Sequence, residues 1–78
     1  MWYVYLLRCS DASIYTGCTS NLEERLKRHR SKQVSYTKMR LPVEVETYIA
    51  FSDKYKAYHF EKYLKSGSGK AFSNKRLL

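Results

Sequence analysis

Two short runs near the N-terminus constrain the fold of this chain more than any other feature. Residues 2–8 read WYVYLLR and residues 13–17 read SIYTG, and both runs are rich in the aromatic, β-branched and aliphatic side chains that favour strands. The residues between them read CSDA, which are small or polar and typical of a turn. The sequence therefore predicts an antiparallel hairpin at the start of the chain.

The register of this hairpin determines which side chains share a face. With Arg8 opposite Ala12, Tyr5 lies directly opposite Tyr15. Directly opposed side chains share a face and stand about 5 Å apart at Cβ, so both phenols are expected to point into one site. Because side chains alternate between faces, the opposite face carries the predicted core residues, namely Trp2, Val4, Leu6, Ile14 and Thr16.

A helix is predicted over residues 20–31. Ser20 and Glu23 form the S-x-x-E pattern of a capping box at its start. At 100° per residue, Arg25 and His29 fall within about 60° of the first leucine of the apolar stripe. The inward face of this helix therefore carries an arginine and a histidine as candidate site residues. In the structural alternative, Arg25 only extends along the edge of the core.

A basic connection and a third strand follow this helix. Residues 32–42 read KQVSYTKMRLP, and Pro42 disfavours a helix before it. Residues 43–51 alternate between apolar and polar side chains, which predicts a strand with one buried face, joined to the hairpin as a third antiparallel strand. The side expected to be buried carries Val43, Val45, Thr47, Ile49 and Phe51.

A second helix is predicted over residues 54–66, with Ser52 or Asp53 as its cap. Its apolar stripe consists of Ala57, Phe60 and Leu64. Glu61 is the only acid in this helix and lies at the margin of that stripe, about 40° from Ala57. A carboxylate that leans toward the core needs a cation, a hydrogen-bond network or a metal ion. A structural salt bridge to one of the many nearby bases is the alternative.

These segments predict an α+β fold, with one domain over residues 1–78. The expected architecture is a small three-stranded antiparallel sheet flanked by helices, in the order β-β-α-β-α. Residues 66–69 (SGSG) end the second helix, and the basic tail at residues 70–78 has room for one further short helix. A chain of 78 residues has a thin core, near the lower limit for folding without disulfides or metals.

The charge of the chain points to a polyanionic partner. Fifteen Lys and Arg stand against seven Asp and Glu, which gives a formal net charge of +8. Residues 25–40 contain bases and no acid, and the same holds for residues 62–78. Because basic side chains neutralise phosphates and exposed tyrosines stack on bases, this pattern favours nucleic-acid binding. A basic surface that only aids solubility is the alternative.

The cysteines and the lengths of the apolar runs indicate the cellular compartment of the protein. Cys9 and Cys18 are predicted to be free thiols, as in intracellular proteins. They lack CxxC spacing, so a zinc site that they would share with His29 and His59 is the less favoured alternative. No apolar run approaches the roughly 18 residues of a membrane span, and no signal-peptide pattern is present. We therefore expect a soluble, cytoplasmic protein that has no membrane partner.

Five features in order resemble a known family. They are Tyr3-Val4-Tyr5, Tyr15-Thr16-Gly17, the helical Arg25 eight residues later, His29 one turn further on, and Glu61 in the second helix. With this order and spacing, nearly the whole chain resembles the GIY-YIG nuclease family, and most closely its small stand-alone bacterial members. Glu61 takes the place of the metal-binding glutamate of that family.

Three positions bear on how far the resemblance extends. Tyr3 stands where the family signature begins with glycine, and Cys18 stands where some active members carry a lysine that helps to ionise a tyrosine. Asn74 is the candidate for the C-terminal asparagine that contacts phosphate in several members.

The resemblance implies a metal-dependent endonuclease that hydrolyses DNA phosphodiester bonds. A single Mg²⁺ or Mn²⁺ ion would have Glu61 as its only protein ligand. Arg25 would grip the phosphate and stabilise the charge that builds there. Tyr5 would accept a proton from water, helped by cations that favour its phenolate. Tyr15 would hydrogen-bond the water or the phosphate, and His29 would orient Tyr5 or take the proton itself.

The expected partner is DNA, in repair or recombination, and RNA is not excluded because phosphate contacts do not distinguish the two. A non-cleaving nucleic-acid-binding module of the same fold and a protein-interaction domain are the alternatives. The chain leaves no room for a recognition domain, so a protein partner could supply specificity. The residues predicted to contact nucleic acid are Gly17, Arg28, Lys32, Lys38, Arg40, Lys65, Lys70 and Asn74.

Overall fold

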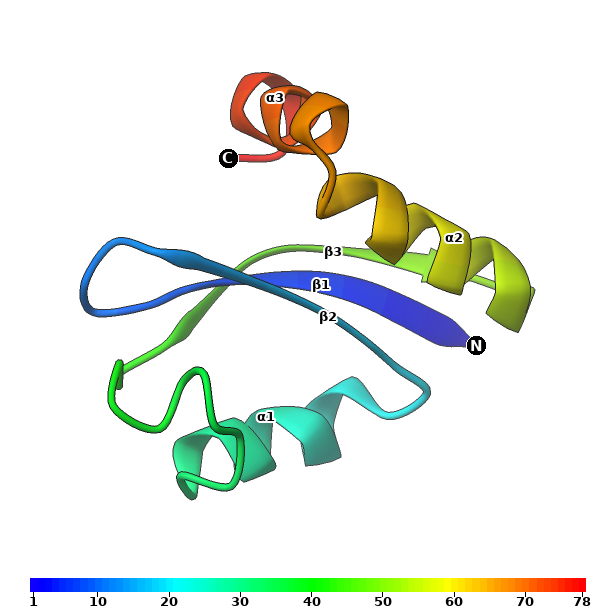
Figure 1. Ribbon diagram of the computed structural model, residues 1–78. Helices are drawn as coiled ribbons and strands as arrows, with labels where there is room; N and C mark the ends of the chain where they lie inside the picture. The colour runs from blue at the N-terminus through cyan, green and yellow to red at the C-terminus, as the bar shows by residue number, and fades with distance from the viewer.

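The computed structural model describes residues 1–78 and has three layers, with a sheet between helices (Figure 1). Helix α1 lies on one face of the sheet, and α2 and α3 lie on the other. The sheet is antiparallel with strand order β2-β1-β3, so the predicted α+β fold and its element order are confirmed. The elements are β1 (Trp2–Arg8), β2 (Ile14–Thr19), α1 (Leu22–Arg30), β3 (Glu44–Phe51), α2 (Lys54–Leu64) and α3 (Gly67–Arg76).

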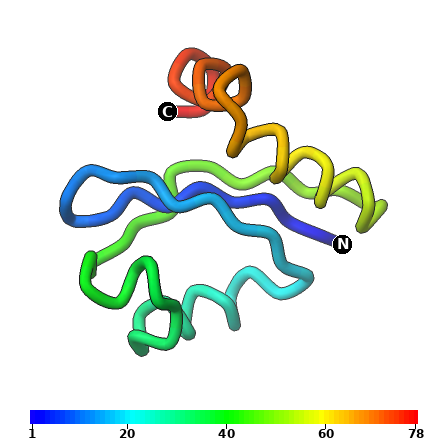
Figure 2. The backbone as a smooth tube through the Cα atoms, in the orientation of Figure 1, coloured from blue at the N-terminus to red at the C-terminus, as the bar shows by residue number.

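Strand β1 is the buried centre of the protein. Val4 and Leu6 point to the α2 face and pack with Ala57 and Leu64. The residues between and after them, Tyr5 and Leu7, point to the α1 face, where they cluster with Cys9 and Val43. This alternation follows from the period of two in a strand. The backbone trace in Figure 2 shows the segment after α1 returning along the α1 face to the start of β3.

The predicted register of the hairpin is wrong by two residues. Tyr5 pairs with Gly17, and Tyr15 pairs with Leu7. Arg8 pairs with Ile14 instead of Ala12, because the Cys9 N–H donates to the Ser13 carbonyl and the Asp11 side chain accepts from the Ser13 N–H at 3.0 Å. A shift of two leaves every side chain on its predicted face.

The single buried face predicted for the third strand is also wrong. Leu6 pairs with Thr47, but Leu7 pairs with Val45, so the register shifts by one residue at Glu46. Such a bulge places Val45 and Thr47, on either side of Glu46, on opposite faces of the sheet. As a result, Val45 packs in the cluster on the α1 face, while the Thr47 hydroxyl donates to the carbonyl of Leu77, beyond α3.

The helices begin at polar caps. Asn21 caps α1 by accepting the Glu24 N–H at 3.0 Å, so the capping box predicted at Ser20 is wrong by one residue. Asp53 caps α2 by accepting the Tyr55 N–H at 2.8 Å, as predicted. Each cap satisfies a backbone donor that the first turn leaves without a partner.

The SGSG segment begins a helix as well as ending one. Ser66 caps α3 by accepting the Gly69 N–H at 3.1 Å, which confirms the further short helix near the C-terminus but starts it at Gly67. Gly69 is buried at the junction of α2 and α3, where it lets the two backbones approach closely. No helix of the protein combines the length and apolar character needed to cross a membrane.

We predict that Gly69→Ala destabilises the protein whereas Gly67→Ala does not. A Cβ added at Gly69 would lie 2.6 Å from the Leu64 Cα, but a Cβ added at Gly67 has no neighbour within 4 Å. Overpacking costs about 1–3 kcal/mol of unfolding free energy, and alanine in place of an unhindered helical glycine adds up to about 1 kcal/mol. Urea unfolding checks both variants, and equal midpoints would contradict the close packing of α3 on α2.

Candidate active site

The two phenols of the paired strands meet a histidine on the α1 face of the sheet. The Tyr5 hydroxyl lies 3.0 Å from the Nε2 atom of His29. The ring of Tyr15 is centred 4.9 Å from the ring of His29 and 6.2 Å from that of Tyr5. Although Tyr5 and Tyr15 are not opposed in register, the structure therefore brings three of the predicted site residues together.

A chain of hydrogen bonds fixes the proton positions of the histidine. The Thr37 hydroxyl donates to the Val34 carbonyl at 3.4 Å and lies 2.8 Å from the Nδ1 atom of His29. We assign the Nδ1–H to the bond with Thr37, which leaves the Nε2 atom to accept the proton of Tyr5. Both His29 and Thr37 are fully buried.

Thr37 is a site residue that the sequence reasoning missed. It lies in the irregular segment between α1 and β3, where a single threonine in a basic connection carries no periodic signal. Only the fold brings it within hydrogen-bond distance of His29, eight residues earlier.

Gly17 leaves space for the phenol of Tyr5. A Cβ added at Gly17 would lie 2.5 Å from the Tyr5 Cζ atom and 2.8 Å from Cε1. Real Cβ atoms do not approach other atoms so closely, so any side chain at this position would displace the Tyr5 ring. Packing against Tyr5 therefore explains the glycine, and a close approach of a DNA backbone at Gly17 stays a prediction.

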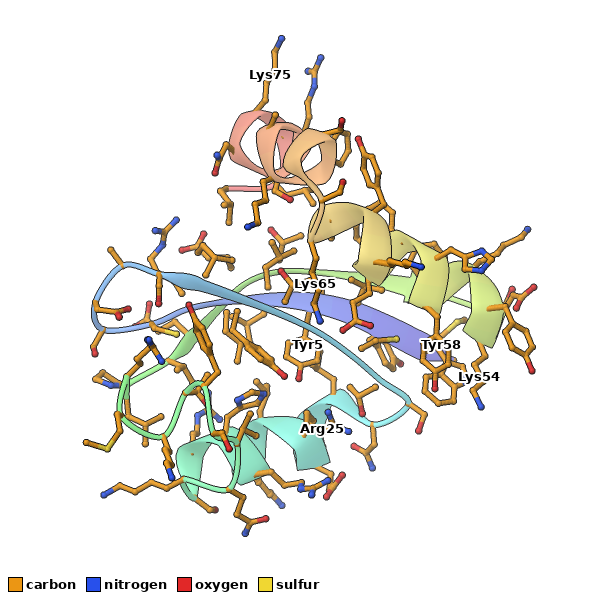
Figure 3. All side chains as sticks on the ribbon, viewed as in Figure 1. Tyr5, Arg25, Lys54, Tyr58, Lys65 and Lys75 are labelled. Carbon is orange, nitrogen blue, oxygen red and sulfur yellow. The ribbon has the colours of Figure 1, made fainter.

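Arg25 extends from α1 toward this cluster. Its Nε atom is buried and has no hydrogen-bond partner. A buried donor without an acceptor is costly, so the guanidinium is poised for an anion. Figure 3 shows Tyr5 between the sheet and α1, with Arg25 on the helix and Lys65 reaching down from the end of α2.

Glu61 approaches from the opposite face of the sheet, on α2. Its carboxylate pairs with the Lys65 ammonium at 3.1 Å, which is the salt bridge considered as the structural alternative. Cys18 lies on the edge strand β2, and the pKa of its thiol is raised. Burial and then Glu61 raise this pKa, while Arg25 and Lys65 partly offset the rise. Charges from both α1 and α2 thus act on this residue of β2.

The Tyr5 phenol keeps its proton in the protein without a bound metal. Burial is the largest cause that raises its pKa, and the neighbouring Tyr15 and Glu61 raise it further. Arg25 lowers the pKa both as a charge and as a hydrogen-bond donor, but burial outweighs it. The cation effect expected from the sequence is present, yet it does not suffice to ionise the phenol.

The donor set limits which metal ion the site fits. No group of three or more His, Cys, Asp or Glu side chains lies close enough together to hold an ion. Glu61 is a single carboxylate, and its charge and that of Arg25 both act on the pKa of the Cys18 thiol. Mg²⁺ keeps several waters and is often held by one or two carboxylates with substrate phosphates, so the residues present fit a weakly held magnesium ion that a phosphate completes.

The other predicted nucleic-acid contacts fall into three groups. Arg40 is engaged within the protein, with Asp11 at 3.0 Å and with its guanidinium 4.1 Å above the centre of the Tyr36 ring. The bases of α1 and of the connection after it, Arg28, Lys32 and Lys38, are exposed. Three others line a cavity of about 520 Å³ at the β2 edge, namely Lys65, Lys70 and Asn74.

Comparison with known proteins identifies the family. A model of the GIY-YIG catalytic domain matches residues 1–76. The chain belongs to the GIY-YIG family. The resemblance read from the five sequence features is thereby confirmed, and it assigns this GIY-YIG protein to a family of nucleases.

Relatives of this GIY-YIG protein occur in several bacteria. A UPF0213 protein of Bacillus licheniformis is 45% identical over 69 residues, which cover 87% of this chain and 71% of that protein. A UPF0213 protein of Clostridium perfringens is 44% identical over 66 residues, 83% of this chain and 71% of that protein. The NMR structure of a UPF0213 protein from Bacillus halodurans superposes with a TM-score of 0.62 at 34% identity, and covers 99% of this chain and 87% of that one.

The buried imidazole predicts a pH dependence of folding. Burial, and then the nearby charge of Arg25, lower the pKa of His29 from its ordinary value of 6.5. The unfolded chain therefore binds a proton that the folded protein excludes, and the unfolding free energy falls as the pH drops below about 6.5. Urea unfolding at pH 7 and pH 5 measures this loss, which we expect to shrink in His29→Gln.

The exposed histidine supplies the matched control. His59 lies on α2 and is exposed, so His59→Gln is expected to keep the wild-type loss of stability between the two pH values. If His29→Gln lost as much stability on acidification as the wild-type protein, a group other than the buried imidazole would be responsible.

Proposed function

We propose that this protein is a metal-dependent endonuclease that hydrolyses DNA phosphodiester bonds. One observation carries the proposal: the Nε atom of Arg25 is buried and has no partner. The charge of Arg25, on α1, and that of Glu61, on α2, both act on the pKa of the Cys18 thiol between these layers. They lie beside a tyrosine that donates to a buried histidine. Phosphodiester hydrolysis needs this combination of an anion holder, a metal ligand and a proton acceptor.

Arg25 holds and stabilises the phosphate. Its fork of donors matches two phosphate oxygens, and a charge-assisted bond strengthens as negative charge builds in the transition state. The unpartnered Nε atom means that no internal acceptor has to be displaced there first.

Tyr5 and His29 move the proton. The Tyr5 hydroxyl donates to the Nε2 atom of His29, so Tyr5 can take a proton from the attacking water as it passes its own to the imidazole. His29 is neutral because its pKa is lowered, and it is free to accept. Thr37 holds the ring in the tautomer that this transfer requires. Glu61 would hold a Mg²⁺ or Mn²⁺ ion, which would supply polarisation of the phosphate and would offset the carboxylate charge that raises the pKa of Tyr5.

The basic surface supports nucleic acid as the substrate. The net charge of +8 attracts a polyanion over a wide surface. We propose DNA, acted on in repair or recombination, with RNA sharing the same phosphate chemistry. We also propose a protein partner that supplies specificity.

A non-cleaving nucleic-acid-binding module is the second candidate. It is favoured by the Lys65 ammonium, which already occupies the carboxylate of Glu61. A lysine in this position could serve as a permanent substitute for a metal ion, and the protein would then bind phosphates without cutting.

The decisive variant is Glu61→Gln, assayed with Mn²⁺ on duplex, single-stranded and branched DNA. We expect cleavage to fall by at least about a hundredfold, because the ion loses its protein ligand, while DNA affinity stays equal or rises. Glu44→Gln is the control, since Glu44 is exposed on the far edge strand β3. Absence of cleavage by the wild-type protein on every substrate would favour the binding module.

A further inference from the structure

The cavity at the β2 edge lies beside the cluster of Tyr5, Tyr15 and His29. No step of the proposed reaction uses this cavity. It measures about 520 Å³, and its walls come from the edge of the hairpin, the end of α2 and the inward side of α3. Ligand sites of small molecules span about 300–1,000 Å³, so a mononucleotide fits within it. Tyr15 belongs both to this wall and to the cluster around His29.

A buried hydroxyl in this cavity lacks a partner. Ser73 of α3 is only 4% exposed and lines the cavity, and its Oγ atom has no hydrogen-bond partner. Leaving a buried polar group without a partner costs free energy, and native proteins do so rarely. The hydroxyl can both donate and accept, as a bond to the edge of a nucleobase requires.

The remaining walls match the other parts of a nucleotide. Tyr15 and Tyr36 stand at one side with ring centres 5.6 Å apart, and Tyr36 is 40% exposed although the Arg40 guanidinium covers one face of its ring. The ammonium groups of Lys65 and Lys70 supply positive charge, and no acidic side chain lines the cavity. Apolar walls, an aromatic face, a free hydroxyl and cations together complement a base joined to a phosphate.

We propose that this cavity binds one unstacked nucleotide of the substrate strand next to the phosphate held by Arg25. The inference rests on the proposed function and deepens it, because it assigns a base-binding subsite to the same enzyme. An apolar peptide would leave the Ser73 hydroxyl and the Lys70 ammonium without partners, and a phosphate alone would not use the aromatic face. A nucleotide has a base for the aromatic face and the Ser73 hydroxyl, and a phosphate for the lysines.

The test is metal-free titration of labelled protein with dAMP, 2-deoxyribose 5-phosphate and inorganic phosphate, followed by NMR shifts. We expect dAMP to bind at least about fivefold more tightly than the probes that lack a base, since stacking on an aromatic side chain contributes this much. Shifts should centre on Ser73 and Asn74. Equal affinity for all three probes, or shifts elsewhere, would overturn the proposal.

Variants separate the subsite from general charge. Lys70→Ala and Tyr36→Ala should each weaken dAMP binding several-fold. Lys75→Ala is the matched control, because Lys75 lies on the same helix and points away from the sheet (Figure 3). Ser73→Ala should weaken dAMP binding yet raise the urea midpoint, because it removes an unpartnered hydroxyl. An effect of Lys75→Ala equal to that of Lys70→Ala would contradict the subsite.

These measurements are independent of cleavage. If DNA is cut but dAMP does not bind, the proposed function stands and the subsite falls. If dAMP binds with the expected preference but no DNA is cut, the subsite stands and the nuclease proposal fails.

Discussion

The hydrogen bond from Tyr5 to His29 is the interaction on which the rest of the site depends. A phenol that is fully buried on the central strand needs an acceptor, and the imidazole of α1 provides it at 3.0 Å. The bond ties α1 to the sheet, requires a glycine on β2 to make room for the ring, and makes Thr37 necessary to orient the histidine. Folding and the proposed proton transfer thus use the same contact.

The placement of charge shows a compromise between stability and function. Burial keeps the proton on Tyr5, and the Nε atom of Arg25 has no partner, so neither group contributes its full interaction to the protein without substrate. Both costs can be recovered when a phosphate and a cation enter. The pair formed by Glu61 and Lys65 satisfies the carboxylate in the meantime at little energetic cost, because Lys65 remains exposed to solvent.

Much of the fold follows from the sequence because its signals are local. Residue type predicted the two hairpin strands and alternation predicted the third. A helical wheel placed Arg25 and His29 on one face, and Ser52 or Asp53 marked the start of α2. The rest depends on three-dimensional context. The Asx contact that delays the hairpin turn and the bulge at Glu46 leave no periodic trace, and Thr37 becomes a site residue only where the chain folds back.

The most direct test of the account is paramagnetic broadening by Mn²⁺ in the labelled, nucleotide-free protein. If charges from the two helical layers converge at the β2 edge, the amide signals of Glu61, Cys18 and Arg25 should broaden first and together. Broadening centred on the acidic first turn of α1, at Glu23 and Glu24, with sharp signals at Glu61 and Cys18, would contradict it.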